Sequence, residues 1–430
     1  MKLDHLRLLS LKGRRALLRD FMLLSTVLGS LSWCQTQDLH AQDLYAQGLP
    51  SPQHTNKAVH GGCDTKAIEC ANAASPFIQA DGTVLLVWTA KGSVMVAKSK
   101  DGGQSFAEGM EIAHHDKFLD TGADARAQIT GDAFGRVMVA YAFFKDSQWN
   151  AQINISTSLD YGEHFSPPKP LIPKGVSERF PSLGLDQRQR LFVTWVDKRL
   201  VHQERLKGKK KLGGSVALAY TDDWGLSFKG EHVVHTDSCE CCRIALDVSM
   251  PQTKLLAYRA LFSGGLRDHA VQVLSDQGQA SAPRKVADDH WQTDVCPHQG
   301  PTVALSENTT IHTAWFTQGQ QRQGLFYARS SDLGVHFSTP MAMGDLNTPE
   351  SRPYVVSLGQ EVWMVWKRFD GQRSSVMMRH SSDDGQSWSH EVSLSQTAGY
   401  SDHPLLIKTS KRVYLSWLTR IEGFQLKALN

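Results

Sequence analysis

The sequence predicts an all-β protein, a single β-propeller of seven blades with four antiparallel strands in each blade. Two observations predict this fold. A turn motif of eight residues occurs five times, and an apolar strand ending near an aromatic residue occurs seven times. Such repeats indicate units that bury their apolar faces only by stacking against neighbours, as propeller blades do.

The turn motif reads Ser/Thr-x-Asp-x-Gly-x-x-Phe/Trp and predicts a tight hairpin. The Asp carboxylate can accept backbone N–H groups of its own turn, the Gly supplies a positive φ, and the aromatic packs the turn against its blade. We therefore expect these carboxylates to be structural. The five copies are Ser99–Phe106, Ser158–Phe165, Thr221–Phe228, Ser330–Phe337 and Ser381–Trp388, and a degenerate sixth copy is Asp276–Gly278.

The aromatic residues set the number of blades. Seven of them recur at intervals of 51–63 residues, at Trp88, Tyr141, Trp195, Tyr258, Trp315, Trp366 and Trp417. This spacing favours seven blades, with six as the alternative. The last unit, from His403, has room for three strands. We expect residues 57–60 to add its outer strand and close the ring, which removes free sheet edges.

The turn motif resembles the Asp-box of the sialidase superfamily, and the resemblance spans residues 57–430. Sialidases have six blades, so a seventh unit departs from their pattern. Two further motifs, Cys239-x-Cys241-Cys242 and Cys296-Pro-x-x-Gly300-Pro301, are similar to a bacterial subgroup of Asp-box propellers described as exo-α-sialidases. The resemblance implies either a propeller that acts on a carboxylate-bearing sugar, or one that shares ancestry with the sialidases but not their activity.

The first 41 residues are expected to be an export signal. Arg14-Arg15 precedes an apolar run from Phe21 to Trp33, which resembles a twin-arginine signal, and Ala41 offers a small residue for cleavage. Residues 42–56 are polar and are expected to form a flexible leader before the propeller, residues 57–430. We therefore expect a periplasmic or secreted protein.

Net charge and hydropathy limit the kinds of partner that the sequence indicates. The formal net charge of +3 favours no nucleic-acid partner, and beyond the N-terminal region the sequence has no apolar run long enough to span a membrane. We therefore expect the partner to be a small-molecule, glycan or metal ligand. We also expect the protein to be a monomer. A basic insertion in the third unit, Lys198 to Gly214, is expected to be a solvated loop.

The cysteines suggest a metal site. Cys239, Cys241 and Cys242 precede the first strand of one unit, and Cys296 and His298 precede the first strand of the next, so all five side chains could meet. Three or four thiols and an imidazole suit copper(I) or zinc. Disulfide bonding is the alternative in an exported protein, with thiol redox chemistry as a third use of the same sulfur atoms. The spacing also makes Cys63 and Cys70 a candidate disulfide pair.

A glycosidase site is the competing interpretation, so the sequence leaves open whether the protein is an enzyme. The resemblance to sialidases implies arginines that bind a substrate carboxylate and a tyrosine nucleophile activated by a glutamate. The matching residues are Arg179, Arg352, Tyr400 and Glu350, with Asp120 or Asp124 as the acid. The alternative is that these arginines pair with nearby carboxylates around a polar channel.

Overall fold

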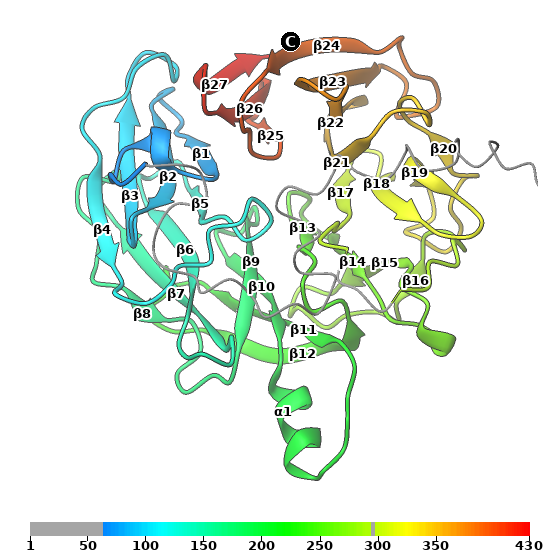
Figure 1. Cartoon of the computed structure of the whole chain (residues 1–430), viewed down its shortest axis with the longest axis horizontal. Coiled ribbons are helices and arrows are strands. Elements are labelled where there is room, and N and C mark those ends of the chain that lie inside the picture. Colours follow the sequence, from blue (N-terminus) through cyan, green and yellow to red (C-terminus); the bar gives the residue numbers. More distant parts are fainter. Residues whose placement is uncertain (1–62, 294–296) are drawn as a thin grey trace, which may run out of the picture. The chain divides into compact units, whose positions relative to one another are not determined.

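The computed structural model describes residues 63–293 and 297–430. The expected export signal, leader and closing strand at residues 57–60 lie outside the described residues. The described residues form a β-propeller of seven blades, one sheet per blade (Figure 1). The fold predicted from the repeats is therefore confirmed, with seven blades and not six. Six blades have four strands, and the seventh has three among the described residues.

The strands follow one another along the chain within each blade, and every pair is antiparallel. The first three blades contain β1 (Ala74–Ile78), β2 (Val84–Ala90), β3 (Ser93–Ser99), β4 (Met110–His114), β5 (Gln128–Gly131), β6 (Val137–Phe144), β7 (Ala151–Ser158), β8 (Lys169–Pro170), β9 (Glu178–Leu185), β10 (Leu191–Asp197), β11 (Gly214–Thr221) and β12 (Lys229–Ser238). The next two contain β13 (Ala245–Asp247), β14 (Lys254–Arg259), β15 (His269–Leu274), β16 (Arg284–Lys285), β17 (Thr302–Leu305), β18 (Ile311–Gln318), β19 (Gln323–Ser330) and β20 (Met341–Ala342). The last two contain β21 (Glu350–Leu358), β22 (Glu361–Phe369), β23 (Ser374–Ser381), β24 (Val392–Thr397), β25 (Leu405–Lys408), β26 (Val413–Thr419) and β27 (Gly423–Ala428).

The apolar core lies between the blades. Each of the seven buried clusters found among the described residues joins two neighbouring blades. One cluster joins the last blade to the first, because Trp88 of β2 shares it with Leu418 of β26. The rings of Phe106 and Phe424 also meet edge to face across this junction, with centroids 5.7 Å apart. The ring therefore closes by packing between β1–β4 and β25–β27.

The seven periodic aromatic residues are all buried on the second strands, as predicted. Trp195, Trp315, Trp366 and Trp417 have no measurable exposure. Several of their indole N–H groups donate to a neighbouring acid or carbonyl, such as Trp195 to Asp197 Oδ2 at 3.0 Å. Each aromatic ring thus fills the space between blades, and all but Trp366 have a hydrogen-bond partner of normal geometry for their polar atom among the described residues.

The turn motif folds as predicted. In the first copy, Asp101 Oδ1 accepts the backbone N–H groups of Gln104 and Ser105, and Ser99 Oγ accepts the N–H of Gly103. These hydrogen bonds lower the pKa of Asp101 well below its ordinary value. The motif glycine also packs on the preceding blade, and a Cβ on Gly103 would lie 3.1 Å from Leu426. The motif therefore braces its own turn and joins adjacent blades.

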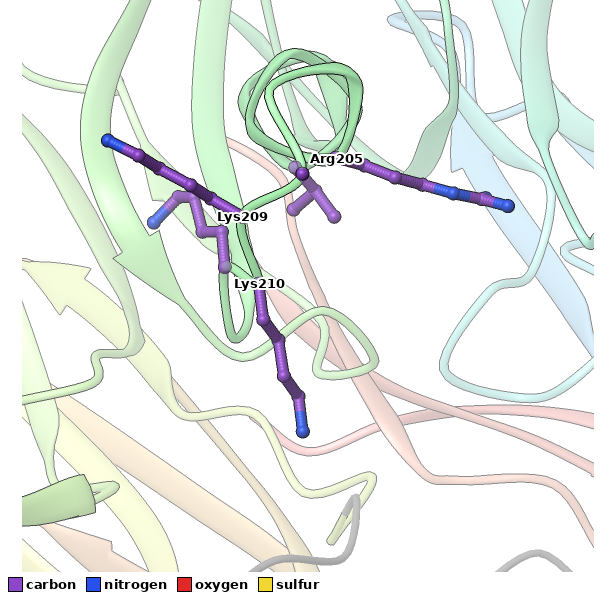
Figure 2. Close-up of a pocket in the computed structure, with 6 residues that line it drawn as sticks. Arg205, Lys209 and Lys210 are labelled. Carbon is purple, nitrogen blue, oxygen red and sulfur yellow. The ribbon is translucent and has the colours of Figure 1, made fainter.

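The basic insertion between β10 and β11 differs from the expected loop. Residues 199–206 form a helix, α1 (Arg199–Leu206), without a buried residue, and an exposed basic segment with Lys209 and Lys210 follows it (Figure 2). The short helices η2 (Ile68–Cys70) and η3 (Ser263–Gly265) complete the elements. In the part of the chain that the structure describes, every helix is too short or too polar to cross a membrane.

Candidate functional site

The front face of the propeller is the face at which the first strand of every blade begins. The second strand returns to this face, and the third strand ends on the opposite back face, where the turn motifs lie. The segments leading into the first strands are rich in polar and charged side chains. They carry Arg126, Cys239–Arg243, His298 and Asp402, and the predicted Arg179 and Arg352 lie at the starts of β9 and β21.

Three thiols meet on the segment between β12 and β13. The Sγ atoms of Cys239, Cys241 and Cys242 all lie within 4.8 Å of one another, and the three residues are buried. Cys239 Sγ and Cys241 Sγ are 3.5 Å apart. The Cys239 N–H donates to the carbonyl of Arg259 on β14, which fixes the segment against its own blade. The predicted convergence of these three cysteines is therefore present.

Two arginines place positive charge beside the thiols. Arg267 Nη1 lies 4.0 Å from Cys239 Sγ, and its Nε donates to the carbonyl of Thr293. Arg259 is completely buried, stacks on Trp291 and donates to backbone carbonyls, including that of Gln299. Burial raises the pKa of the Cys242 thiol well above its ordinary value, and Arg259 opposes that increase.

The other two predicted ligands are Cys296 and His298. Cys296 lies outside the described residues. His298 does not join the group of three thiols within 4.8 Å. It is nevertheless near enough to Cys239 for that thiol to affect its pKa, which burial lowers. The backbone of His298 has a φ of 50°, and its carbonyl accepts a hydrogen bond from Arg352.

A second histidine near the thiols was missed in the sequence. His269, at the start of β15, is 1% exposed, and neither ring nitrogen makes a hydrogen bond of normal geometry within the described residues. Burial holds its pKa well below the ordinary value, and both Arg259 and Cys239 influence it. The available signal was a histidine at the start of a largely apolar strand.

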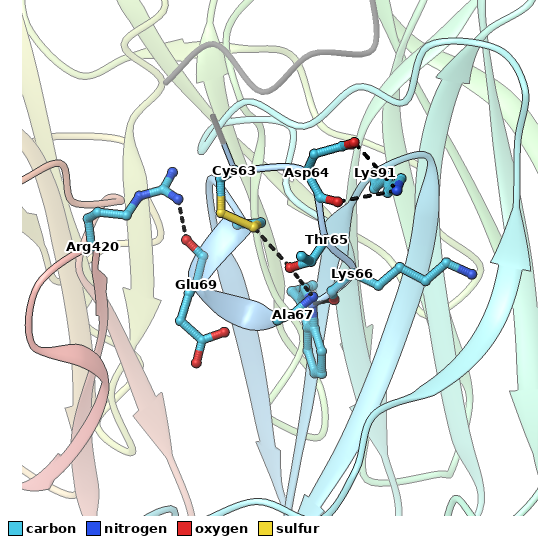
Figure 3. Close-up of a disulfide and its surroundings, with 10 residues drawn as sticks. Cys63, Asp64, Thr65, Lys66, Ala67, Glu69, Lys91 and Arg420 are labelled. Atoms are coloured by element: carbon cyan, nitrogen blue, oxygen red, sulfur yellow. Dashed lines mark hydrogen bonds and ion pairs between the residues drawn. A yellow bond between two sulfur atoms is a disulfide. The ribbon is translucent and has the colours of Figure 1, made fainter. Parts of the chain in front are cut away.

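The predicted disulfide between Cys63 and Cys70 is present (Figure 3). Their Cα atoms lie 5.4 Å apart, within the ordinary range for a bridged pair. The bridge closes the segment that contains η2, whose Glu69 carbonyl accepts a hydrogen bond from Arg420 of the last blade. It therefore supports the junction between the last and first blades.

A buried charge network also occupies the front face. Arg352 Nη1 lies 2.6 Å from Asp124 Oδ2, and His403 Nδ1 lies 3.4 Å from the other carboxylate oxygen. Burial alone would raise the pKa of Asp124, but Arg352 and His403 together hold it far below its ordinary value. Arg243 donates to the carbonyl of Pro353 and also lowers the pKa of Asp124.

Arg126 joins this network to the last blade. Its Nη1 lies 3.2 Å from Asp402 Oδ2, and it donates to the carbonyls of Ala74, Ala123 and His403. Burial raises the pKa of Asp402 to about 6, although Arg126 favours its ionised form. Lys367, which the sequence did not single out, donates to the Ser401 carbonyl, and burial lowers its pKa to about 8. Three blades thus meet through buried charges.

The residues predicted for sialidase chemistry each have a partner within the protein. Arg179 donates to Asp120 at 2.7 Å and packs on the rings of Phe144 and Phe180. Tyr400 Oη donates to the Asn72 carbonyl at 3.0 Å, and burial raises its pKa to about 12. Glu350 pairs with Arg368. Arg352 alone of the four lies in the network around Asp124.

The propeller is similar to several solved structures. A PL25-family ulvan lyase has a TM-score of 0.53 and 9% identity, covering 81% of this chain and 89% of that one. A protein of unknown function from Dyadobacter fermentans has a TM-score of 0.47 and 15% identity over 83% and 92% of the two chains. A Hadza microbial sialidase has a TM-score of 0.46 and 12% identity over 81% and 73%. No protein-family model and no curated protein sequence matches the chain. At these identities the similarity shows the shared fold alone.

Proposed function

We propose that this protein is an exported propeller that binds a soft or borderline metal ion, copper(I) or zinc, at its front face. The observation that carries the proposal is the convergence of three buried thiols, Cys239, Cys241 and Cys242, within 4.8 Å. Thiolates are the preferred ligands of copper(I) and are common ligands of zinc. The segment that holds the thiols is fixed by backbone hydrogen bonds, so the ligand atoms are brought together before any ion arrives.

Disulfide bonding uses three adjacent thiols poorly. One bridge can join only two of them, and a bridge between the neighbouring Cys241 and Cys242 would strain the backbone. The third thiol would then need Cys296 as its partner. A metal ion can use all three sulfur atoms at once.

The surrounding charge also suits a metal–thiolate centre. Three thiolates exceed the charge of copper(I) by two and that of zinc by one. Arg267 at 4.0 Å from Cys239 Sγ, together with the buried Arg259, supplies compensating positive charge. Without such compensation a buried anionic centre would be costly.

The two metals differ in the ligands they need. Three sulfur atoms are enough for a copper(I) site, whereas structural zinc takes four ligands in a tetrahedron. Cys296 and His298 are the fourth ligands that the sequence suggests, and the buried His269 adds another. Loss of metal on replacement of the fourth ligand therefore separates zinc from copper(I).

Elemental analysis of protein purified from the periplasm tests the proposal. We expect about one equivalent of copper or zinc in the wild type, and none in Cys241→Ser. The Cys296→Ser, His298→Ala and His269→Ala variants should retain copper(I), but one of the three should lose zinc. The double variant Cys63→Ser/Cys70→Ser removes the distant disulfide and should keep the metal. Absence of metal, with Cys239, Cys241 and Cys242 all in disulfides, would overturn the proposal.

A glycoside hydrolase acting on a carboxylate-bearing sugar is the second candidate. It is favoured by the buried arginines of the front face: Arg352 and Arg243 influence Asp124, and Arg126 pairs with Asp402. The three arginines come from three different blades. Guanidinium groups bind carboxylates in pairs of parallel hydrogen bonds. The ulvan lyase that shares the fold is bound to -[GlcA(1-4)Rha3S]-, an oligosaccharide containing an acidic sugar.

The sialidase form of this candidate assigns Tyr400 as nucleophile, Glu350 as its activating base, and Arg179 and Arg352 as carboxylate ligands. The Tyr400 hydroxyl, whose pKa is raised, donates to a backbone carbonyl. Catalysis would require this hydrogen bond to be replaced by one to the activating base. Turnover of a fluorogenic sialoside, abolished in Tyr400→Phe and Arg352→Ala, would favour this candidate over metal binding. No turnover at any pH between about 4 and 9, the range in which carboxylates and imidazoles titrate, would exclude it.

A further inference from the structure

A basic arm projects from the third blade. It comprises residues 198–212, and α1 extends beyond the sheets of the propeller (Figure 1). Seven of the residues from Lys198 to Lys211 are Lys or Arg, and one is acidic. The arm connects β10 to β11, so it leaves the propeller from the front face.

Ion pairs fix the two ends of the arm to the propeller. At one end Lys198 pairs with Glu240 at 3.1 Å, and at the other Lys211 pairs with Asp237 at 2.6 Å. Glu240 lies between Cys239 and Cys241, so the base of the arm contacts the segment that holds the thiols. The arm therefore has a defined position beside the thiol cluster.

Three cations at the tip of the arm remain without an ion pair in the described part of the chain. They are Arg205, Lys209 and Lys210, and all are exposed. Figure 2 shows their side chains extending away from one another and from the backbone. They line an open hollow of about 420 Å³ together with Val201, Gly208 and Lys211.

Exposed leucines flank these cations. Leu206 is 75% exposed at the end of α1, and Leu212 is 60% exposed after the lysine run. Leu206 and Leu212 therefore place apolar side chains on both sides of the lysine run. Cations beside apolar side chains are typical of segments that lie on an anionic membrane surface.

We propose that this arm binds anionic phospholipid headgroups, with Arg205, Lys209 and Lys210 contacting the phosphates and Leu206 and Leu212 entering the headgroup region. Each Lys or Arg near an anionic surface strengthens binding by about a factor of five. Three such contacts give about a hundredfold, and the leucines add apolar contact. Because the arm leaves from the front face, binding would hold the thiol cluster close to the membrane.

Co-sedimentation of the purified full-length mature protein with lipid vesicles tests this proposal. We expect binding to vesicles of phosphatidylglycerol and phosphatidylcholine, weakening as salt is added, and little binding to phosphatidylcholine alone. Arg205→Glu/Lys209→Glu/Lys210→Glu should lower binding by about a hundredfold or more. The matched control Lys100→Glu/Lys411→Glu/Arg412→Glu makes the same charge change on the back face and should bind nearly as wild type. Thermal unfolding of both variants should match that of the wild type.

The Leu206→Ser/Leu212→Ser variant separates a membrane from a soluble polyanion. It should lose vesicle binding while retaining any salt-sensitive binding to heparin. Equal loss of vesicle binding in the front-face and back-face variants would overturn the proposal, since net charge alone would then explain it. Binding to heparin but not to anionic vesicles would also overturn it and assign the arm to a soluble anionic polymer. Neither outcome depends on whether the thiols hold a metal.

Discussion

The sulfur atoms of Cys239 and Cys241 lie 3.5 Å apart, and the residue between them, Glu240, points to Lys198 of the basic arm. A disulfide needs sulfur atoms at about 2.0 Å, so a small movement of either side chain would allow these two to bridge. The same two atoms can instead serve as ligands to one ion. The state of this pair therefore reports directly on whether the site holds a metal.

We predict that a mild thiol oxidant such as diamide will join Cys239 to Cys241 in the metal-free protein. Peptide mapping should then show a bridged peptide that has lost two hydrogens, with Cys242 still free. Protein loaded with copper(I) or zinc should resist the reagent, because coordinated thiolates are held by the ion and are less able to attack. Equal oxidation of loaded and metal-free protein would contradict the assignment of these sulfur atoms as ligands.

The turn motif gives a prediction about stability. A Cβ on Gly385 would lie 1.9 Å from Tyr327 Oη, which accepts or donates a hydrogen bond with the buried His312. Gly385→Ala should therefore destabilise the protein by about 2–5 kcal/mol, from its positive φ and the broken buried contact. Gly102 also has a positive φ, but nothing lies within 4 Å of its Cβ position. Gly102→Ala should cost only about 1–2 kcal/mol, measured by denaturant unfolding.

The spacing of the aromatic residues was enough to predict the propeller. Trp195 and Trp315 recur because every junction between blades needs one large ring, and that need depends on local strand patterns alone. The meeting of Cys239, Cys241 and Cys242 was also predictable, since the three are neighbours in the chain. The sequence could not predict that Arg267 would approach Cys239, because that contact depends on how the η3 segment folds back.

The sequence could not predict the ion pairs across the ring for a similar reason. Arg352 pairs with Asp124, which lies 228 residues away, only because the ring brings those blades together. The sequence alone suggests that the arginines pair with carboxylates but does not identify Asp124 as the partner of Arg352. His269 was missed because its strand is apolar and its neighbours along the chain carry no ligand pattern. Such contacts depend on the tertiary structure and cannot be predicted from the spacing of residues along the chain.

Ring closure predicts the effect of a truncation. Removal of residues 403–430 would delete β25–β27, the residues that cover Trp88 and the partner of Gly103. The first and sixth blades would then expose apolar faces and sheet edges. We expect the truncated chain to be insoluble or to lose its cooperative unfolding transition by circular dichroism. A soluble truncated chain with a cooperative transition would show that the last blade is dispensable.

Two equivalent glutamates with opposite surroundings give the last prediction. Glu350 faces Arg368 across its sheet and pairs with it, whereas Glu178 faces Asp197 at the same place in its blade. Glu178 is 1% exposed, and neither carboxylate oxygen makes a hydrogen bond of normal geometry among the described residues. Burial raises the pKa of Glu178 to about 7. The folded protein therefore favours the protonated form of this residue.

The sign of the pH effect follows from that raised pKa. The unfolded chain ionises Glu178 near its ordinary pKa of about 4.3, so its contribution to stability is fully present below that pH and is lost as the pH rises through about 7. Glu178→Gln should thus be more stable than wild type at pH 8 by up to about 3 kcal/mol, with the difference fading toward pH 4. Burial also raises the pKa of Glu350, but its pair with Arg368 opposes that increase, so Glu350→Gln should gain less stability at pH 8 than Glu178→Gln. Urea unfolding of both variants from pH 4 to 8 measures this, and parallel pH curves for wild type and Glu178→Gln would show that Glu178 ionises normally in the folded protein.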